Sequence, residues 1–114
     1  MDITDYDMEC IAKAKALIDA DTSIHYSIDH IASVAGIGAT KLKKGFKKQY
    51  QSSLFAYLRT QRMIKAAALL TTTNKTIKQI AKATGFHYTS NFTTAFTTYY
   101  KLSPGSYRQK KQHK

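Results

Sequence analysis

Apolar residues recur along this chain at helical spacing, and two stretches of the pattern are copies of one another. The first copy begins at Ile28 (IDHIASVAGI) and the second begins at Ile77 (IKQIAKATGF). The offset is 49 residues up to Gly36 and Gly85, and one inserted residue makes it 50 beyond them. The later pairs are Leu42/Phe92, Phe46/Phe96, Tyr50/Tyr100, Ser53/Ser103 and Tyr57/Tyr107. So long a repeat indicates two copies of one small structural unit.

The stretch between the copies has the pattern of one long helix. It contains no Gly or Pro from Ser53 to Thr76, and its AAA run favours helix. Its apolar face comprises Leu54, Leu58, Met63, Ala66, Leu69 and Leu70. About 19 helical residues span roughly 28 Å, close to the spacing of about 34 Å between successive major-groove faces of DNA. By length alone, the helix is equally typical of a rod between two DNA-binding units and of a core helix in an ordinary bundle.

The first copy has the pattern of two helices separated by a glycine turn. Ser27 is placed to cap a helix over 28–35, and Gly36 supplies the left-handed turn that ends it. Apolar residues at i, i+4 and i+8 then predict a helix over 39–50 with a polar, basic outer face. Helix, turn and helix in this order is typical of the helix-turn-helix motif.

The second copy repeats the pattern with different surface chemistry. Thr76 and Gln79 form a capping box for a helix over 77–84, and Gly85 precedes a helix over 89–100. The outward face of that last helix is uncharged, because no Lys or Arg occurs from Ala83 to Tyr100. Its polar positions are Ser90, Asn91, Thr94, Thr97 and Thr98.

A further helix is expected before the first copy, over 8–20. Its predicted inward stripe is Met8, Ile11, Ala12, Lys15 and Ile18. We expect this helix to be a scaffold that packs on the first unit, with Cys10 as a small core residue. Asp5 and Asp7 precede it in the position that suits a helix N-terminus, and we expect their reversal to Lys to leave DNA preference unchanged.

Ser103 and Pro104 predict a short final helix, because they supply an N-cap followed by proline at the first helical position. The chain is therefore expected to be all-α, with about seven helices in two helix-turn-helix subdomains joined by a linker helix. The expected bounds are 8–52 for the first unit, 53–72 for the linker, 76–109 for the second unit and 109–114 for a basic tail.

Charge is distributed unevenly along the chain. All seven acidic residues lie in the first 29 positions, whereas sixteen of the eighteen Lys and Arg residues, all but Lys13 and Lys15, follow them. Net charge is +11, which makes double-stranded DNA the expected partner. No apolar run reaches membrane-spanning length and the N-terminus is acidic, so we expect a cytoplasmic chain that contacts no membrane.

The motifs together resemble the DNA-binding domain of the AraC/XylS family of bacterial transcription regulators. The resemblance rests on IASVAG through LKKGFKK in the first half, YLRTQRM in the linker, and IKQIAKATGF with SPGSYR in the second half. It implies a sequence-specific regulator whose second helix in each unit enters the major groove. It also implies these DNA contacts: Ala39, Thr40, Lys43, Lys44, Lys47, Thr89, Ser90, Asn91 and Thr94.

The sequence departs from the family pattern at several positions. Members often carry Arg where Thr94 stands and basic residues where Thr97 and Thr98 stand, which weakens the expected contribution of the second unit. Members also commonly have Gly where Gln51 and Lys101 stand, so these two turns must close without it.

Other functions are less well supported by the residues. The four His residues show no metal-ligand spacing, the single Cys excludes an intrachain disulfide or a cysteine-based zinc site, and no nucleophile motif or late carboxylate pair is present. We therefore expect no enzyme activity and no metal or other cofactor. The alternative is a non-specific architectural DNA- or RNA-binding protein. The expected form is a monomer that works with RNA polymerase at target promoters.

Overall fold

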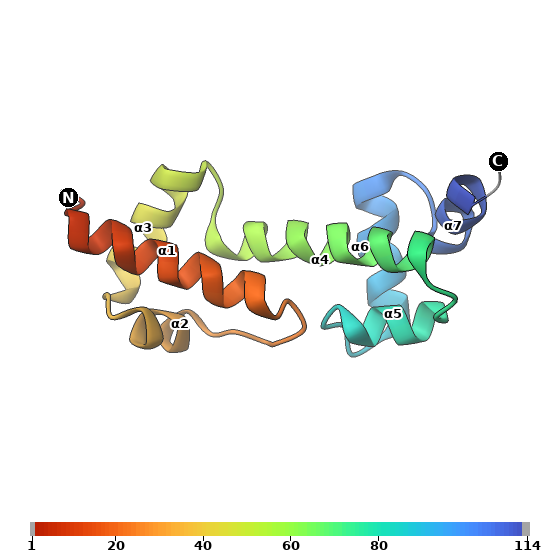
Figure 1. The fold of residues 1–114 in the computed structure, drawn as a ribbon, viewed down its shortest axis with the longest axis horizontal. Coiled ribbons are helices and arrows are strands. Elements are labelled where there is room, and N and C mark those ends of the chain that lie inside the picture. Colours follow the sequence, from red (N-terminus) through yellow and green to blue (C-terminus); the bar gives the residue numbers. More distant parts are fainter. Residues whose placement is uncertain (1, 113–114) are drawn as a thin grey trace. The chain divides into compact units, whose positions relative to one another are not determined.

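The computed structural model describes residues 2–112, which form seven helices and no strand (Figure 1). The helices are α1 (Asp5–Ala20), α2 (Ile28–Ala35), α3 (Ala39–Tyr50), α4 (Leu54–Thr72), α5 (Ile77–Ala83), α6 (Thr89–Tyr100) and α7 (Pro104–Gln112). The all-α prediction is confirmed, and α2, α3 and α6 have the predicted bounds. His113 and Lys114 of the expected tail lie outside the described residues, while 109–112 belong to α7.

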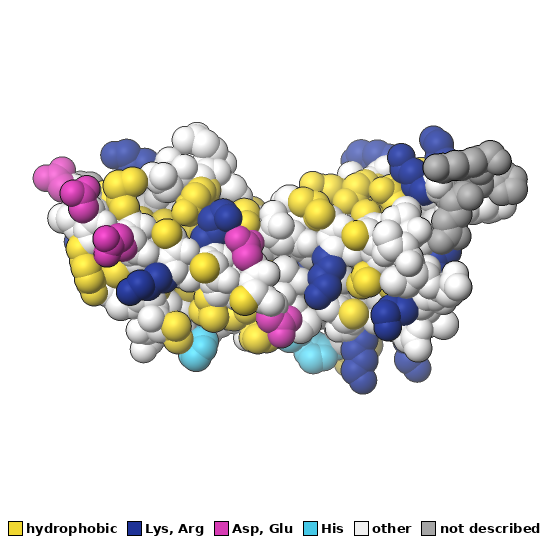
Figure 2. Space-filling model, viewed as in Figure 1, with side chains coloured by type: hydrophobic (Ala, Val, Ile, Leu, Met, Phe, Trp, Pro, Cys, Tyr) yellow, Lys and Arg dark blue, Asp and Glu magenta, His cyan; other side chains and the backbone are white. Residues whose placement is uncertain are grey.

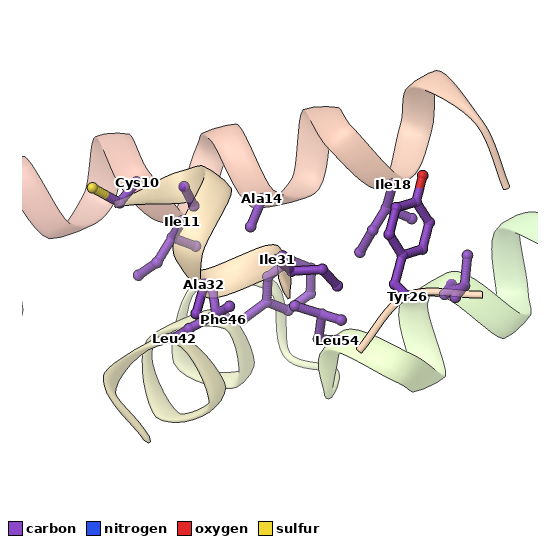
Figure 3. Packing of buried hydrophobic residues seen from close by; sticks show 12 residues of the cluster. Cys10, Ile11, Ala14, Ile18, Tyr26, Ile31, Ala32, Leu42, Phe46 and Leu54 are labelled. Carbon is purple, nitrogen blue, oxygen red and sulfur yellow. The ribbon is translucent and has the colours of Figure 1, made fainter. Parts of the chain in front are cut away.

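The chain divides inside α4 into two compact units, one up to Arg59 and one from Thr60. In the first unit α1 packs on α2 and α3, and Leu54 and Leu58 of α4 close the core (Figure 3). In the second unit the remainder of α4 takes the place of α1. Its Met63, Ala66, Ala67 and Leu70 pack on Ile80, Ala81, Phe92 and Phe96 of α5 and α6.

The repeated aromatic residues form a matching cluster in each unit. In the first unit the Phe46 ring lies 4.7 Å from that of Tyr50 and 5.7 Å from that of Tyr57, centroid to centroid. In the second unit Phe96 lies 4.6 Å from Tyr100 and 5.3 Å from Tyr107. These residues are the sequence pairs at offset 50, so the internal repeat is a repeat of packing.

The helix ends also repeat. The Ile37 and Phe86 amides donate to the Ala32 and Ala81 carbonyls at 3.1 and 2.9 Å, which closes each glycine turn in the same way. Gly36 and Gly85 have φ of 81° and 91°, as predicted for these turns. Ser27 and Thr76 accept from His30 and Gln79 amides, confirming the two predicted caps.

The expected stripe of α1 is partly confirmed, because Ile11 and Ile18 are fully buried and Lys15 is half-buried. Met8 and Ala12 are exposed, and the buried residues are Asp7, Cys10, Ile11, Ala14 and Ile18. The helix begins at Asp5 because Thr4 caps it, with the Thr4 hydroxyl and the Asp7 carboxylate each accepting a backbone N–H of the other residue at 3.1 Å. Asp7 lies before the predicted start of this helix, and its burial is not expected from hydrophobicity.

Two helices end in a left-handed residue that is not glycine. Gln51 after α3 has φ of 61° and Lys101 after α6 has φ of 64°. Their amides donate to the Lys47 and Thr97 carbonyls at 2.8 Å. Both turns therefore close in the left-handed conformation without glycine, with conformational strain at both residues.

Candidate nucleic-acid interface

In the first unit, α3 presents a basic outer face. Leu42, Gly45 and Phe46 are buried beneath it and fix its orientation. Thr40, Lys43, Lys44 and Lys47 are exposed on the opposite side, whereas Ala39 is half-buried against the core. Three of these lysines also line one concavity of about 300 Å³, together with Ile28, Ser53, Leu54 and Phe55. The structure thus brings together Lys43, Lys44 and Lys47.

The acidic helix α1 contacts α3 through an ion pair whose carboxylate is buried and whose lysine is partly exposed. The Lys41 ammonium lies 3.1 Å from the Asp7 carboxylate, whose side chain is 7% exposed. The Thr4 backbone N–H donates to the same carboxylate, and this bond, followed by the Lys41 partner, lowers the pKa of Asp7. Lys41 is therefore paired with α1. The exposed basic face of α3 is formed by its other lysines.

The glycine turn between α2 and α3 is also fixed by α1. The Gly36 carbonyl accepts from the Tyr6 hydroxyl at 3.2 Å and lies 3.6 Å from the Cys10 thiol. Gly45 lies so close to Ile11 that a Cβ at position 45 would stand 2.4 Å from the Ile11 Cδ1 atom. These contacts make α1 a support for the helix-turn-helix, as expected of a scaffold helix.

In the second unit, α6 presents an uncharged polar face. Phe92 and Phe96 are buried beneath it, and Ser90, Asn91 and Thr94 are exposed, with Thr89 half-buried. Hydroxyl and amide groups of this kind can accept and donate to base edges, and Asn can pair bidentately with adenine. The nine predicted DNA contacts thus lie on α3 and α6, seven of them exposed.

In the second unit, two lysines of α5 lie beside the start of α6. Lys78 and Lys82 of α5 line a concavity of about 320 Å³ together with His87 and Thr89 at the start of α6, and with Ala81 and Phe86. Lys78 and Lys82 are both exposed. The two lysines were not among the predicted DNA contacts. Their i, i+4 spacing before the glycine turn places them on one face of α5, and this could have been read from the sequence.

Acidic side chains are confined to the first unit. All seven lie between Asp2 and Asp29, and Figure 2 shows acidic side chains on the first unit and none on the visible face of the second. Among the described residues no group of three or more His, Cys, Asp or Glu side chains is placed to hold a metal ion. No helix between residues 2 and 112 is both long enough and apolar enough to cross a bilayer.

This chain is similar in sequence to the two proteins described next and in structure to a third. Regulatory protein PocR of Salmonella typhimurium is 34% identical over 97 residues, which are 85% of this chain and 32% of PocR. The transposon Tn10 TetD protein of Escherichia coli is 36% identical over 84 residues, 74% of this chain and 61% of TetD. The chain therefore spans about a third of PocR and less than two thirds of TetD.

A solved structure shares the fold. The transcriptional regulator from Chromobacterium violaceum described as AraC-type DNA-binding domain-containing is 24% identical, with a TM-score of 0.84 over 93% of this chain and 95% of that one. A family model described as a helix-turn-helix domain matches residues 31–110. These matched residues include most of both helix-turn-helix units. The chain therefore belongs to the AraC/XylS family of helix-turn-helix DNA-binding transcription regulators.

Proposed function

We propose that α3 and α6 each contact one segment of the major groove, so that the chain recognises a duplex site of roughly two turns. The observation that carries the proposal is the duplicated unit, in which a polar face is exposed on the second helix of each motif. The DNA contacts proposed are Ala39, Thr40, Lys43, Lys44, Lys47, Thr89, Ser90, Asn91 and Thr94.

The two units use different groups to hold the DNA backbone. In the first, Lys43 and Lys44 contact base edges and Lys47 contacts phosphate. In the second, the face of α6 carries no cation, and Lys78 and Lys82 of α5 neutralise phosphates beside it. This assignment follows the usual docking of the motif, in which the first helix crosses the backbone.

As this chain the protein binds DNA as a monomer in the cytoplasm and acts with RNA polymerase at target promoters. The chain spans 32% of PocR and 61% of TetD, and both a stand-alone regulator and the DNA-binding part of a longer one fit this proposal. The target sequence is a property of both contact helices and has to be selected experimentally.

Selection from a random duplex pool tests the proposal. The unmodified chain should enrich one site, and titrations on that site should give a slope of about −5 to −9 for log K against log salt if six to ten phosphates are neutralised. Random duplex and single strands serve as competitors. Absence of enrichment, or tighter binding to single-stranded DNA or RNA, would support the alternative of a non-specific architectural or RNA-binding protein.

A further inference from the structure

Tyr88 occupies an unusual position at the start of α6. It is 67% exposed, more than any other large hydrophobic side chain among the described residues. Its side chain makes no hydrogen bond or ring contact within the part of the chain that the structure describes. The exposure of this ring is therefore not explained by packing in the second unit.

Tyr88 is also the N-cap of α6, and its side chain makes no capping hydrogen bond. Elsewhere this chain caps its helices with hydroxyls that accept a backbone N–H, from Thr4, Ser27, Ser53, Thr76 and Ser103. Helix α3 begins after Gly38, which is an acceptable N-cap residue. Tyrosine offers no acceptor at the required place, so α6 begins without a cap that Ser, Thr or Asp would provide.

A residue that breaks a local rule without a packing gain is expected at a functional position. The N-terminal residues of the second helix in a helix-turn-helix are those that approach the groove. No Lys or Arg occurs from Ala83 to Tyr100, so α6 and the turn before it offer no basic side chain to a phosphate. The phenolic hydroxyl of Tyr88 is a neutral donor that can bind a phosphate oxygen instead.

We propose that Tyr88 is a DNA-contacting residue whose hydroxyl donates a hydrogen bond to a backbone phosphate beside the groove occupied by α6. The inference rests on the proposed function and adds a residue outside the nine predicted contacts. With Tyr88 at the N-cap, α6 lacks a stabilising cap, and the same residue makes a contact that exists only in the DNA complex.

Because Tyr88 leaves α6 uncapped, replacing it by Ser is expected to change stability and DNA binding in opposite directions. Tyr88→Ser restores an N-cap and should raise the urea midpoint of unfolding, yet weaken binding to the selected duplex by roughly tenfold. Tyr88→Phe should weaken binding equally and leave the urea midpoint unchanged, because only the hydroxyl is lost. Both variants should keep the salt slope of the unmodified chain, since a neutral donor releases no counterion. Tyr99→Ser, at the other end of α6 and 46% exposed, is the matched control and should bind normally.

Several results would overturn the proposal. Unchanged binding by Tyr88→Phe would exclude the hydroxyl contact, and a lowered urea midpoint for Tyr88→Ser would show that the ring supports the fold. If the unmodified chain enriches no duplex, the proposed function and this inference fail together. If it enriches a duplex that the Tyr88 variants bind equally well, only this inference fails.

Discussion

The Asp7 carboxylate on α1 and the Lys41 ammonium on α3 lie 3.1 Å apart, with the Asp7 side chain almost completely buried. Asp7 also completes the capping box of α1 with Thr4. One acidic residue thus caps the start of α1 and pairs with α3, the helix proposed to contact DNA. Asp5, two residues earlier in the same helix, is exposed, whereas Asp7 is buried.

We predict that Asp7→Asn destabilises the first unit more than Asp5→Asn does. Both substitutions remove a carboxylate from the first turn of α1, but only Asp7→Asn leaves Lys41 facing a neutral group. Urea denaturation followed by helicity should show a lower midpoint for Asp7→Asn alone. Equal midpoints for the two variants would mean that the ion pair adds nothing beyond the helix N-terminus.

The same pair predicts a pH dependence. The folded pKa of Asp7 is lowered, so its ionised form contributes stability that is fully present above the ordinary value of 3.8 and is lost as pH falls through the folded value. The gap in midpoint between the unmodified chain and Asp7→Asn should therefore be widest near neutral pH. It should narrow in acid below about pH 4, measured at constant ionic strength.

A second prediction concerns the left-handed residues that end α3 and α6. Gln51→Gly should stabilise the first unit by about 0.5–1 kcal/mol, because glycine adopts the positive φ of 61° without the Cβ penalty. Lys101→Gly should do the same for the second unit. Gln51→Ala is the control, since it removes the side chain and retains the Cβ. Stabilisation by Ala equal to that by Gly would locate the strain in the side chain.

A third prediction concerns Arg108, which closes the C-terminal end of α4. Its guanidinium donates to the Leu70, Thr73 and Lys75 carbonyls at 3.0, 3.3 and 2.6 Å. Arg108→Lys cannot reproduce this fork and should lower the stability of the second unit by about 2 kcal/mol in urea titrations. Lys110→Ala removes an exposed charge from the same helix and should leave stability nearly unchanged.

Much of this fold follows from local patterns in the sequence. Helix bounds, glycine turns and the capping residues Ser27 and Thr76 were predictable because each depends on neighbours within a few residues. The roles of Asp7 and Arg108 were not, because their partners lie 34 and at least 33 positions away. A charged residue whose partner is distant in sequence is assigned to solvent by periodicity, so the burial of Asp7 was not predicted.

For the candidate site, the sequence predicted the helices that carry the expected DNA contacts. The resemblance to the family placed the expected DNA contacts on α3 and α6, where seven of the nine residues are exposed, and the contacts themselves stay a prediction. The basic concavity at Lys78 and Lys82 was not predicted, because the resemblance implies contacts only from the second helix of each motif. Which bases are contacted depends on the DNA, and no pattern in the chain specifies it.

The last prediction is that the two contact helices contribute unequally. Lys43→Ala or Lys44→Ala should lower affinity for the selected duplex and relax preference at one or two base pairs, since a lysine on guanine contributes about 1–3 kcal/mol of discrimination. Each should also reduce the salt slope by up to about 0.9 where the lysine neutralises a phosphate. Asn91→Ala or Thr94→Ala should cost less affinity and barely alter the slope, because neither side chain carries charge.

Titration of all four variants on one selected duplex, each with unchanged helicity, decides the comparison. Lys13→Ala is the charge control, because it removes one exposed cation from the acidic helix α1 and should keep both affinity and base preference. A larger loss for Asn91→Ala or Thr94→Ala than for the lysine variants would reverse the ranking. In that case direct hydrogen bonds from the uncharged face of α6 dominate recognition, and the lysines of α3 serve mainly to attract the backbone.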